Sequence, residues 1–264
     1  MSTDLLEACI ECARVMGAVA LTHFVAHRRD RSLVVETKVD GSPVSKADRE
    51  AELAAREFIG RLFPKDGVLG EELGESLPGA ARRWCIDPID GTKTFLRGVP
   101  LWGSLVAVVE GETVLAGAAA FPATNELIAA APGRGCVADG VRIGATTIGE
   151  LVEATVLTTD ERFPDAPECE APWRELARRS KVARTWGDCY GYYLVATGKA
   201  ELMTDGRLSP WDAACFQPII EEAGGVFTDW RGERTAFGRG AIATNRALAV
   251  EMRKVLGVPT KAIE

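Results

Sequence analysis

Two carboxylates stand at the end of a strand that the sequence marks as buried. The stretch reads Trp84-Cys-Ile-Asp-Pro-Ile-Asp-Gly-Thr92, so Asp87 and Asp90 lie three residues apart directly after apolar residues. Burying such acids costs free energy unless a cation compensates their charge. Magnesium fits because it takes oxygen ligands and keeps waters and substrate oxygens in its shell. We therefore expect a fold in which this strand ends at a cation site.

The residues of this turn suggest a division of roles. Asp87 can bridge two ions, Asp90 can hold one of them, and the Ile89 carbonyl faces the same turn. Gly91 and Thr92 would expose backbone N–H groups to an anion beyond the metals. The alternative interpretation is a plain polar turn after a strand. An EF-hand does not match, because its acids stand at alternating positions.

Two further segments offer acids of the same kind. Glu71 directly follows the preceding strand and is a natural third ligand, although taken alone it reads as a surface acid. Asp212 lies at the start of a helix, where the helix dipole favours a carboxylate. Taken alone, Asp212 would simply cap that helix.

Composition narrows the classes of function. The 264 residues include 38 acidic and 31 basic side chains, and the net charge of -7 argues against a nucleic-acid or anionic-membrane partner. A phosphorylated substrate stays possible because a bound cation supplies positive charge locally. No apolar run approaches the roughly 18 residues of a membrane span. The start, Met1-Ser-Thr-Asp4, does not resemble a signal peptide, and seven scattered cysteines read as reduced thiols, so we expect a cytoplasmic protein.

Hydrophobic periodicity predicts an α/β chain with an antiparallel-rich first half and a mixed second half. Residues 1–264 are interpreted as one domain with lobes of about 1–145 and 146–264. Ser45 with Asp48 three residues later resembles a capping box. Helices are expected at 5–26, 47–62, 173–179, 190–197, 211–223 and 245–256. Strands are expected at 32–36, 67–70, 84–86, 103–109, 113–120, 127–130, 141–143, 155–158, 182–185, 200–203, 225–228 and 241–244.

The three acidic segments, in this order, resemble the signature of the inositol-monophosphatase family. They are Gly70-Glu-Glu72, Asp87-Pro-Ile-Asp-Gly-Thr92, and Trp211-Asp212 with the later Glu-Ala-Gly-Gly225. The likeness spans nearly the whole chain. It implies a layered αβαβα sandwich with two or three magnesium ions. It also implies hydrolysis of a phosphate monoester, in which a metal-activated water attacks phosphorus in line.

The resemblance also implies roles for single residues. Asp48 matches the aspartate that pairs with the threonine at Thr92 to orient and help deprotonate the attacking water, and Glu71 is grouped with them as catalytic. Lys38 matches a loop lysine near the metals. The implied metal ligands are Glu71, Asp87, the Ile89 carbonyl, Asp90 and Asp212.

Two stretches resemble the histidinol-phosphate phosphatase branch of that family. They are Thr185-Trp-Gly-Asp-Cys-Tyr-Gly-Tyr192 and Phe95-Leu-Arg-Gly98, where inositol enzymes usually have Asn in place of Arg97. Histidinol phosphate carries an ammonium and an imidazole, so Asp188 beside the leaving group would favour it by charge pairing. Asp205 matches the family's substrate-facing acid. The expected substrate-binding residues are Lys38, Gly91, Thr92, Arg97, Asp188 and Asp205.

Several alternatives stay open at this point. Tyr190 or Trp186 would pack on the substrate ring, but both aromatics can equally belong to the core, and Asp188 can simply cap the next helix. A phosphatase for inositol or sugar phosphates is the second hypothesis, and a non-catalytic scaffold that binds phosphate or metal is the third. The family resemblance also implies a homodimer, with Leu101 and Trp102 as candidates for its interface.

Overall fold

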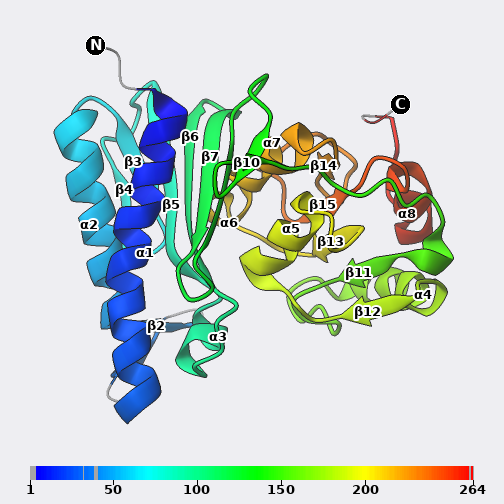
Figure 1. Ribbon diagram of the computed structural model, residues 1–264, viewed down its shortest axis with the longest axis horizontal. Helices are drawn as coiled ribbons and strands as arrows, with labels where there is room; N and C mark the ends of the chain where they lie inside the picture. The colour runs from blue at the N-terminus through cyan, green and yellow to red at the C-terminus, as the bar shows by residue number, and fades with distance from the viewer. Residues whose placement is uncertain (1–3, 32, 39–40, 262, 264) are drawn as a thin grey trace.

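The computed structural model describes residues 4–31, 33–38, 41–261 and 263, arranged in five layers (Figure 1). Helices α1 (Leu5–Asp30) and α2 (Lys46–Leu62) pack together and cover one face of a large sheet. Asp4 caps α1 by accepting the Leu6 N–H, and the predicted capping box at the start of α2 is confirmed. The first three residues, Ser32 and part of the loop after Lys38 lie outside the described residues.

The large sheet has eight strands in the order β10-β9-β8-β7-β6-β5-β3-β4. Among the described residues, the parallel pair of this sheet is β3 with β5, which aligns Gly70 with Ile86. The two strands therefore end at the same edge of the sheet. Glu71 directly follows β3, and Asp87 lies near the end of β5, so both acids are at this edge. The strands are β3 (Gly67–Gly70), β4 (Gly74–Ser76), β5 (Arg82–Asp90), β6 (Gly103–Glu110), β7 (Thr113–Phe121), β8 (Glu126–Ala130), β9 (Cys136–Ala138) and β10 (Val141–Arg142).

A helical layer and a second sheet lie on the other face of the large sheet (Figure 1). The middle layer contains α5 (Asp188–Ala196), α6 (Pro210–Ala213) and α7 (Phe216–Glu222). The second sheet, in the order β12-β11-β13-β15-β14, mixes parallel and antiparallel pairs. Its strands are β11 (Thr155–Leu157), β12 (Val182–Arg184), β13 (Leu202–Asp205), β14 (Val226–Thr228) and β15 (Ala241–Thr244), with α4 (Glu170–Arg179) and α8 (Ala249–Leu256) outside them.

The predicted αβαβα sandwich, antiparallel-rich first and mixed second, is confirmed. The small elements are β1 (Val35–Thr37), β2 (Pro43–Ser45), α3 (Thr92–Leu96) and two short 3₁₀ turns at Leu151–Glu153 and Pro167–Cys169. The prediction of one helix over 211–223 is wrong, because the chain breaks it into α6 and α7. The break brings the Cys215 backbone onto β7, where a Cβ on Gly117 would lie 2.5 Å from the Cys215 carbonyl oxygen.

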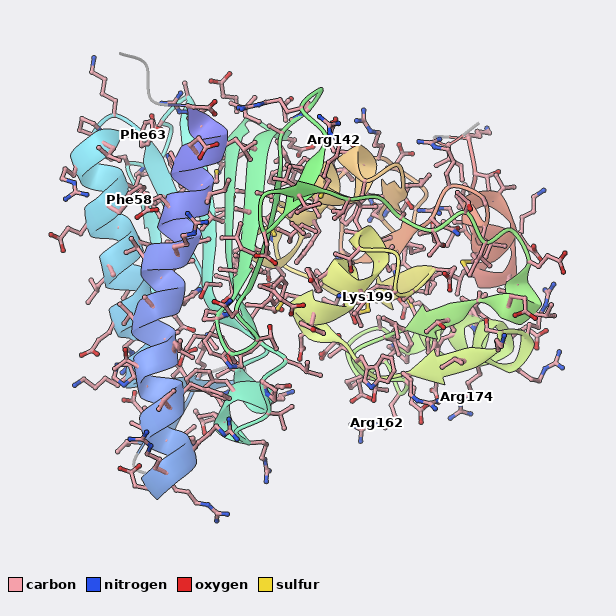
Figure 2. All side chains as sticks on the ribbon, in the orientation of Figure 1. Phe58, Phe63, Arg142, Arg162, Arg174 and Lys199 are labelled. Atoms are coloured by element: carbon pink, nitrogen blue, oxygen red, sulfur yellow. The ribbon has the colours of Figure 1, made fainter. Side chains whose placement is uncertain are left out.

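Surface and core side chains follow ordinary rules. Arg162 and Arg174, labelled in Figure 2, project outward and form ion pairs with the neighbouring acids Asp160 and Glu170. Within the described ranges, no helix combines the length and the apolar character needed to cross a membrane.

Trp102 is fully buried, with its ring 5.3 Å from Phe24 and 4.9 Å from Phe95. The suggestion that Trp102 forms an interface is therefore wrong.

The Gly117 contact gives a test of how the site-bearing α6–α7 segment is held. In Gly117→Ala, the added methyl group meets the Cys215 backbone, and overpacking of this kind costs roughly 1–3 kcal/mol. We expect a lower urea midpoint for Gly117→Ala. The matched control is Gly60→Ala in α2, where an added Cβ meets nothing within 4 Å. That control should unfold at or above the wild-type midpoint, and equal midpoints for both variants would contradict the packing account.

Candidate active site

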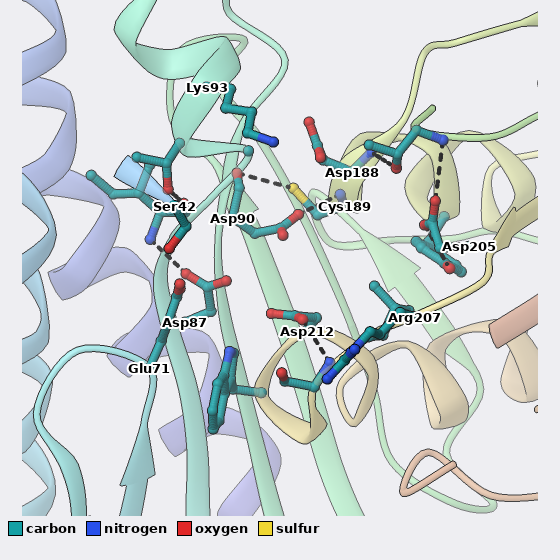
Figure 3. A pocket seen from close by; sticks show the side chains of 18 of the residues that line it. Ser42, Glu71, Asp87, Asp90, Lys93, Asp188, Cys189, Asp205, Arg207 and Asp212 are labelled. Carbon is teal, nitrogen blue, oxygen red and sulfur yellow. Dashed lines mark hydrogen bonds between the residues drawn. The ribbon is translucent and has the colours of Figure 1, made fainter. Parts of the chain in front are cut away.

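Acidic side chains from three separate elements meet in one cavity of about 500 Å³. Asp87 and Asp90 come from the end of β5, and Asp212 comes from α6; one carboxylate oxygen from each lies within 4.8 Å of the others. Glu71, from the turn after β3, lines the same cavity, and Figure 3 shows its side chain beside Asp87. The structure therefore brings all four predicted metal carboxylates together.

Backbone N–H groups hold three of these acids, Asp87, Asp90 and Asp212, in place. The Ile89 N–H donates to Asp87 Oδ1 at 2.9 Å, and the Ser209 N–H donates to Asp212 Oδ2 at 2.8 Å. The Cys189 N–H at the start of α5 donates to Asp90 Oδ2. Asp212 thus caps the start of α6 as the acid of a capping box and also lines the cavity. The capping interpretation and the cavity interpretation of this residue are therefore compatible.

Burial and mutual repulsion destabilise the charged forms of these acids. Burial, followed by the charges of Glu71 and Asp90, raises the pKa of Asp87 well above its usual range. Burial, followed by the charge of Asp188, does the same to the pKa of Asp90. Burial raises the pKa of Asp212 to about 7. A divalent cation with oxygen ligands would relieve this repulsion, and the donor set consists of carboxylate oxygens, so the residues present fit magnesium.

Lys38 lies where a loop lysine near the metals was predicted. Its ammonium Nζ donates to Glu71 Oε1 at 2.8 Å and to Glu72 Oε1 at 2.6 Å. The buried carboxylate of Glu52 shapes the same turn by accepting the Glu72 N–H at 2.8 Å. A Cβ on Gly70 would lie 2.2 Å from Glu52 Oε1, so an added side chain there would displace this carboxylate from the turn. The turn that carries Glu71 is therefore fixed from two sides.

The predicted pair of Asp48 with Thr92 is not formed among the contacts of the described residues. Asp48 Oδ2 accepts both the Ser45 N–H at 2.8 Å and the Ser45 hydroxyl at 2.6 Å, which is the capping box of α2. The Thr92 hydroxyl instead donates to the Ile89 carbonyl at 3.0 Å. Thr92 lines the cavity and Asp48, which is buried, does not. The capping geometry explains the difference, because it turns this Asp48 oxygen toward its own helix start.

The predicted substrate acids Asp188 and Asp205 both line the cavity, as do Gly91 and Thr92. Asp188 adopts a left-handed backbone with φ of 49°, and its Oδ2 accepts the Thr94 hydroxyl at 3.2 Å. It does not cap α5, whose N-cap Gly187 makes no side-chain cap bond. Burial raises the pKa of the Asp188 carboxyl and raises the pKa of Asp205 to about 6.

A second chamber of about 550 Å³ adjoins the first and shares Asp188 with it. Arg97 and Val99 line only this second chamber. The second chamber also contacts Glu71, but Asp87, Asp90 and Asp212 line only the first. The predicted substrate residue Arg97 therefore lies in a chamber that adjoins the acid cluster and shares Glu71 and Asp188 with it.

The predicted ring-binding aromatics lie elsewhere. Tyr190 packs on Phe121 with centroids 5.4 Å apart and donates its hydroxyl to Glu126 at 3.0 Å. Trp186 is 44% exposed and lines neither chamber. Tyr190 therefore belongs to a cluster between β8 and α5, as the core interpretation held, and the packing of Trp186 on substrate stays a prediction.

The cavity contains residues that sequence reasoning missed. They are Ser42, Lys93, Thr159, Tyr192 and Arg207, and Figure 3 labels Ser42, Lys93 and Arg207 in the pocket. Some signals were available: Lys93 follows Thr92 directly, and Arg207 stands two residues after Asp205. No sequence pattern marks Thr159 as a cavity residue, because its place in the cavity depends on contacts with residues far along the chain.

The fold and the acid cluster define a class of protein that comparison with known families makes explicit. The model of the inositol monophosphatase family matches residues 2–257, and the chain belongs to this family. A histidinol-phosphatase of Chlorobaculum parvum is 41% identical over 97% of both chains. A histidinol-phosphatase of Mycobacterium tuberculosis is 37% identical over 83% of this chain and 86% of the relative.

Other relatives carry different names. The fructose-1,6-bisphosphatase/inositol-1-monophosphatase of Thermotoga maritima is 31% identical over 96% of both chains. Among solved structures, the extragenic suppressor protein suhB of Bartonella henselae superposes with a TM-score of 0.88 at 25% identity, covering 96% of this chain and 98% of its own. Its membership of this family and its similarity to these phosphatases show that the chain is a phosphoric monoester hydrolase, and such enzymes act on small phosphorylated substrates.

The raised pKa of Asp212 predicts how the metal-free protein responds to pH. The unfolded carboxyl ionises near pH 3.9, so between about pH 4 and 7 the unfolded chain releases this proton while the folded chain keeps it. Protonated Asp212 therefore contributes its full stability to the fold below the pKa of the unfolded carboxyl. This contribution is lost as the pH rises through the pKa that Asp212 has in the folded protein. In EDTA, we expect the free energy of unfolding to fall between pH 5 and pH 7.

Asp212→Asn provides the matched comparison, because its amide oxygen can still accept the Ser209 N–H without titrating. We compare the free energies of unfolding of the two proteins by urea titration in EDTA. The difference between variant and wild type should shift in favour of the variant by at least about 1 kcal/mol from pH 5 to pH 7, since one pKa unit corresponds to about 1.4 kcal/mol. Added magnesium should stabilise the wild type more than the variant. Parallel pH curves for the two proteins would show that Asp212 ionises normally in the fold.

Proposed function

We propose that this protein is a magnesium-dependent histidinol-phosphate phosphatase, which releases histidinol and phosphate in histidine biosynthesis. The observation that carries the proposal is a pair of carboxylates, Asp188 and Asp205, that line the cavity in addition to its four metal-type acids. An alcohol bearing a cation is the leaving group that such acids favour. The relatives named histidinol-phosphatases, at 34–41% identity, support the same choice.

The residues proposed to hold two or three magnesium ions are the four acids of the cluster with one carbonyl. Glu71, Asp87 and the Ile89 carbonyl would take one ion, and Asp87, Asp90 and Asp212 another. Bound magnesium supplies positive charge for phosphate oxygens and lowers the pKa of water. The protein holds these ligands in place beforehand through the N–H groups of Ile89, Cys189 and Ser209.

The protein's own groups would then orient the attacking water and the ester. The Thr92 hydroxyl lines the cavity and donates its proton to the Ile89 carbonyl, so its oxygen is left to accept a hydrogen bond from water. Glu71 is the proposed acceptor of the water proton. Asp48 would support this side of the site indirectly by fixing Ser45 and the start of α2.

Charge pairing would account for the proposed preference for this leaving alcohol. The Asp188 carboxylate lines the acid-lined cavity, and its Oδ2 lies 3.2 Å from where a Cβ on Gly91 would stand. Since both chambers share Asp188, it can pair with an ammonium while the rest of the alcohol extends toward Arg97. Inositol carries only hydroxyls and gains nothing from this charge. The preference is therefore expected to be electrostatic and to depend on the ionised Asp188.

The test compares kcat/KM for histidinol phosphate and inositol 1-phosphate, with magnesium, in wild type and Asp188→Asn. Asparagine keeps the shape and tolerates the left-handed backbone, so the variant removes mainly the charge. Hydrogen bonds to charged groups contribute about 1.5–3 kcal/mol, so kcat/KM for histidinol phosphate should fall roughly ten- to hundredfold. Turnover of inositol 1-phosphate should change much less.

Other results would redirect the assignment. A wild-type preference for inositol 1-phosphate would contradict the histidinol-phosphate proposal and favour the second candidate, a broader phosphatase like the Thermotoga maritima relative named for fructose-1,6-bisphosphatase and inositol-1-monophosphatase activities. A similar loss on both esters in Asp188→Asn would assign this residue to the common chemistry instead of substrate choice.

A further inference from the structure

One residue outside every predicted motif contacts both substrate acids. Thr159 lies two residues beyond the end of β11. Its hydroxyl Oγ1 accepts the Asp188 N–H at 2.8 Å, and its own N–H donates to Asp205 Oδ1 at 3.1 Å. The two acids come from different elements, α5 and β13, so Thr159 is a direct link between them.

A close backbone approach reinforces this link. A Cβ on Gly187 would lie 2.2 Å from Thr159 Cα and 2.7 Å from Thr159 N. The obstructing atoms belong to the main chain, so they cannot rotate away as a flexible side chain does. Only glycine therefore allows the segment that carries Asp188 to lie this near to Thr159.

The two acids differ in what else holds them. Asp205 is 7% exposed, and its Oδ2 accepts the Tyr192 hydroxyl at 3.0 Å; the Tyr192 ring stacks on Phe216 at 4.9 Å. The Asp188 carboxylate has the Thr94 hydroxyl as its side-chain partner. Asp205 is thus anchored in the core, whereas the backbone N–H of Asp188 has the Thr159 hydroxyl as its partner.

We propose that Thr159 is a positioning residue for substrate choice: it sets the separation of Asp188 and Asp205, so that both carboxylates bind one cationic alcohol. This inference rests on the proposed function, because it concerns how the same cavity selects its ester. Thr159 acts through the two acids: among the described residues, its hydrogen bonds go to Asp188 and Asp205 and to none of the four metal-type carboxylates. Its loss should change selectivity more than the shared hydrolytic chemistry.

The test uses Thr159→Val, which keeps the shape and the backbone N–H but removes the acceptor for the Asp188 N–H. Thr159→Ser is the matched control, because it retains the hydroxyl. The readout is the ratio of kcat/KM for histidinol phosphate to kcat/KM for p-nitrophenyl phosphate, whose alcohol has no cation. Loss of a neutral hydrogen bond corresponds to roughly a five- to tenfold change, so this ratio should fall about that much in Thr159→Val, mainly through KM, and largely recover in Thr159→Ser.

Two independent measurements guard against a merely structural effect. Amide hydrogen exchange at Asp188 should be faster in Thr159→Val than in Thr159→Ser. Gly187→Ala, which pushes the same segment away from Thr159, should lower the same ratio. A ratio that stays at the wild-type value in both Thr159→Val and Gly187→Ala, or an equal loss on both esters, would overturn the inference.

The outcome for the wild type separates this inference from the proposed function. A wild type that does not prefer histidinol phosphate overturns both, because the two acids then select no cation. A wild-type preference that survives Thr159→Val overturns the positioning role alone and leaves the proposed function in place.

Discussion

Repulsion among buried carboxylates is the constraint on which the site depends. Asp87, Asp90 and Asp212 present oxygens within 4.8 Å of one another, and burial together with mutual charge raises the pKa of each. A fold gains nothing in stability from such a cluster by itself. The surrounding structure must hold the acids together at a cost that a bound cation would offset, and the layers of the sandwich meet at this point.

The means of holding the acids are local and come from both halves of the chain. The parallel pairing of β3 with β5 places Glu71 beside Asp87, and the capping box of α6 orients Asp212. The N–H of Cys189, at the start of α5, reaches across to Asp90. The residue before it, Asp188, therefore enters the cavity because of the same turn. The proposed substrate acid Asp188 and the bond that holds the proposed metal ligand Asp90 therefore share one piece of backbone.

The sequence was sufficient where the chemistry is local and insufficient where distant segments meet. The strand that ends in Asp87 and Asp90, and the helix start at Asp212, follow from short patterns, whereas the five-layer order was implied by the family resemblance. Tyr190 was misplaced because its partner Glu126 lies 64 residues away. The pair of Asp48 with Thr92 was expected although the capping box of Asp48 was visible in the sequence; Asp48 Oδ2 accepts the capping bonds from Ser45, and the Thr92 hydroxyl donates to the Ile89 carbonyl three residues before it.

The central claim is that the acid cluster binds magnesium and gives up protons to do so. Its most direct test is calorimetric titration of magnesium into metal-free protein near pH 6.5, in two buffers with different ionisation enthalpies. Because ligands must be deprotonated to bind a metal and the pKa of Asp212 is about 7, the account predicts saturable binding with net proton release. Asp87→Asn should weaken this binding strongly. Absence of saturable binding, or binding without proton release, would contradict the account.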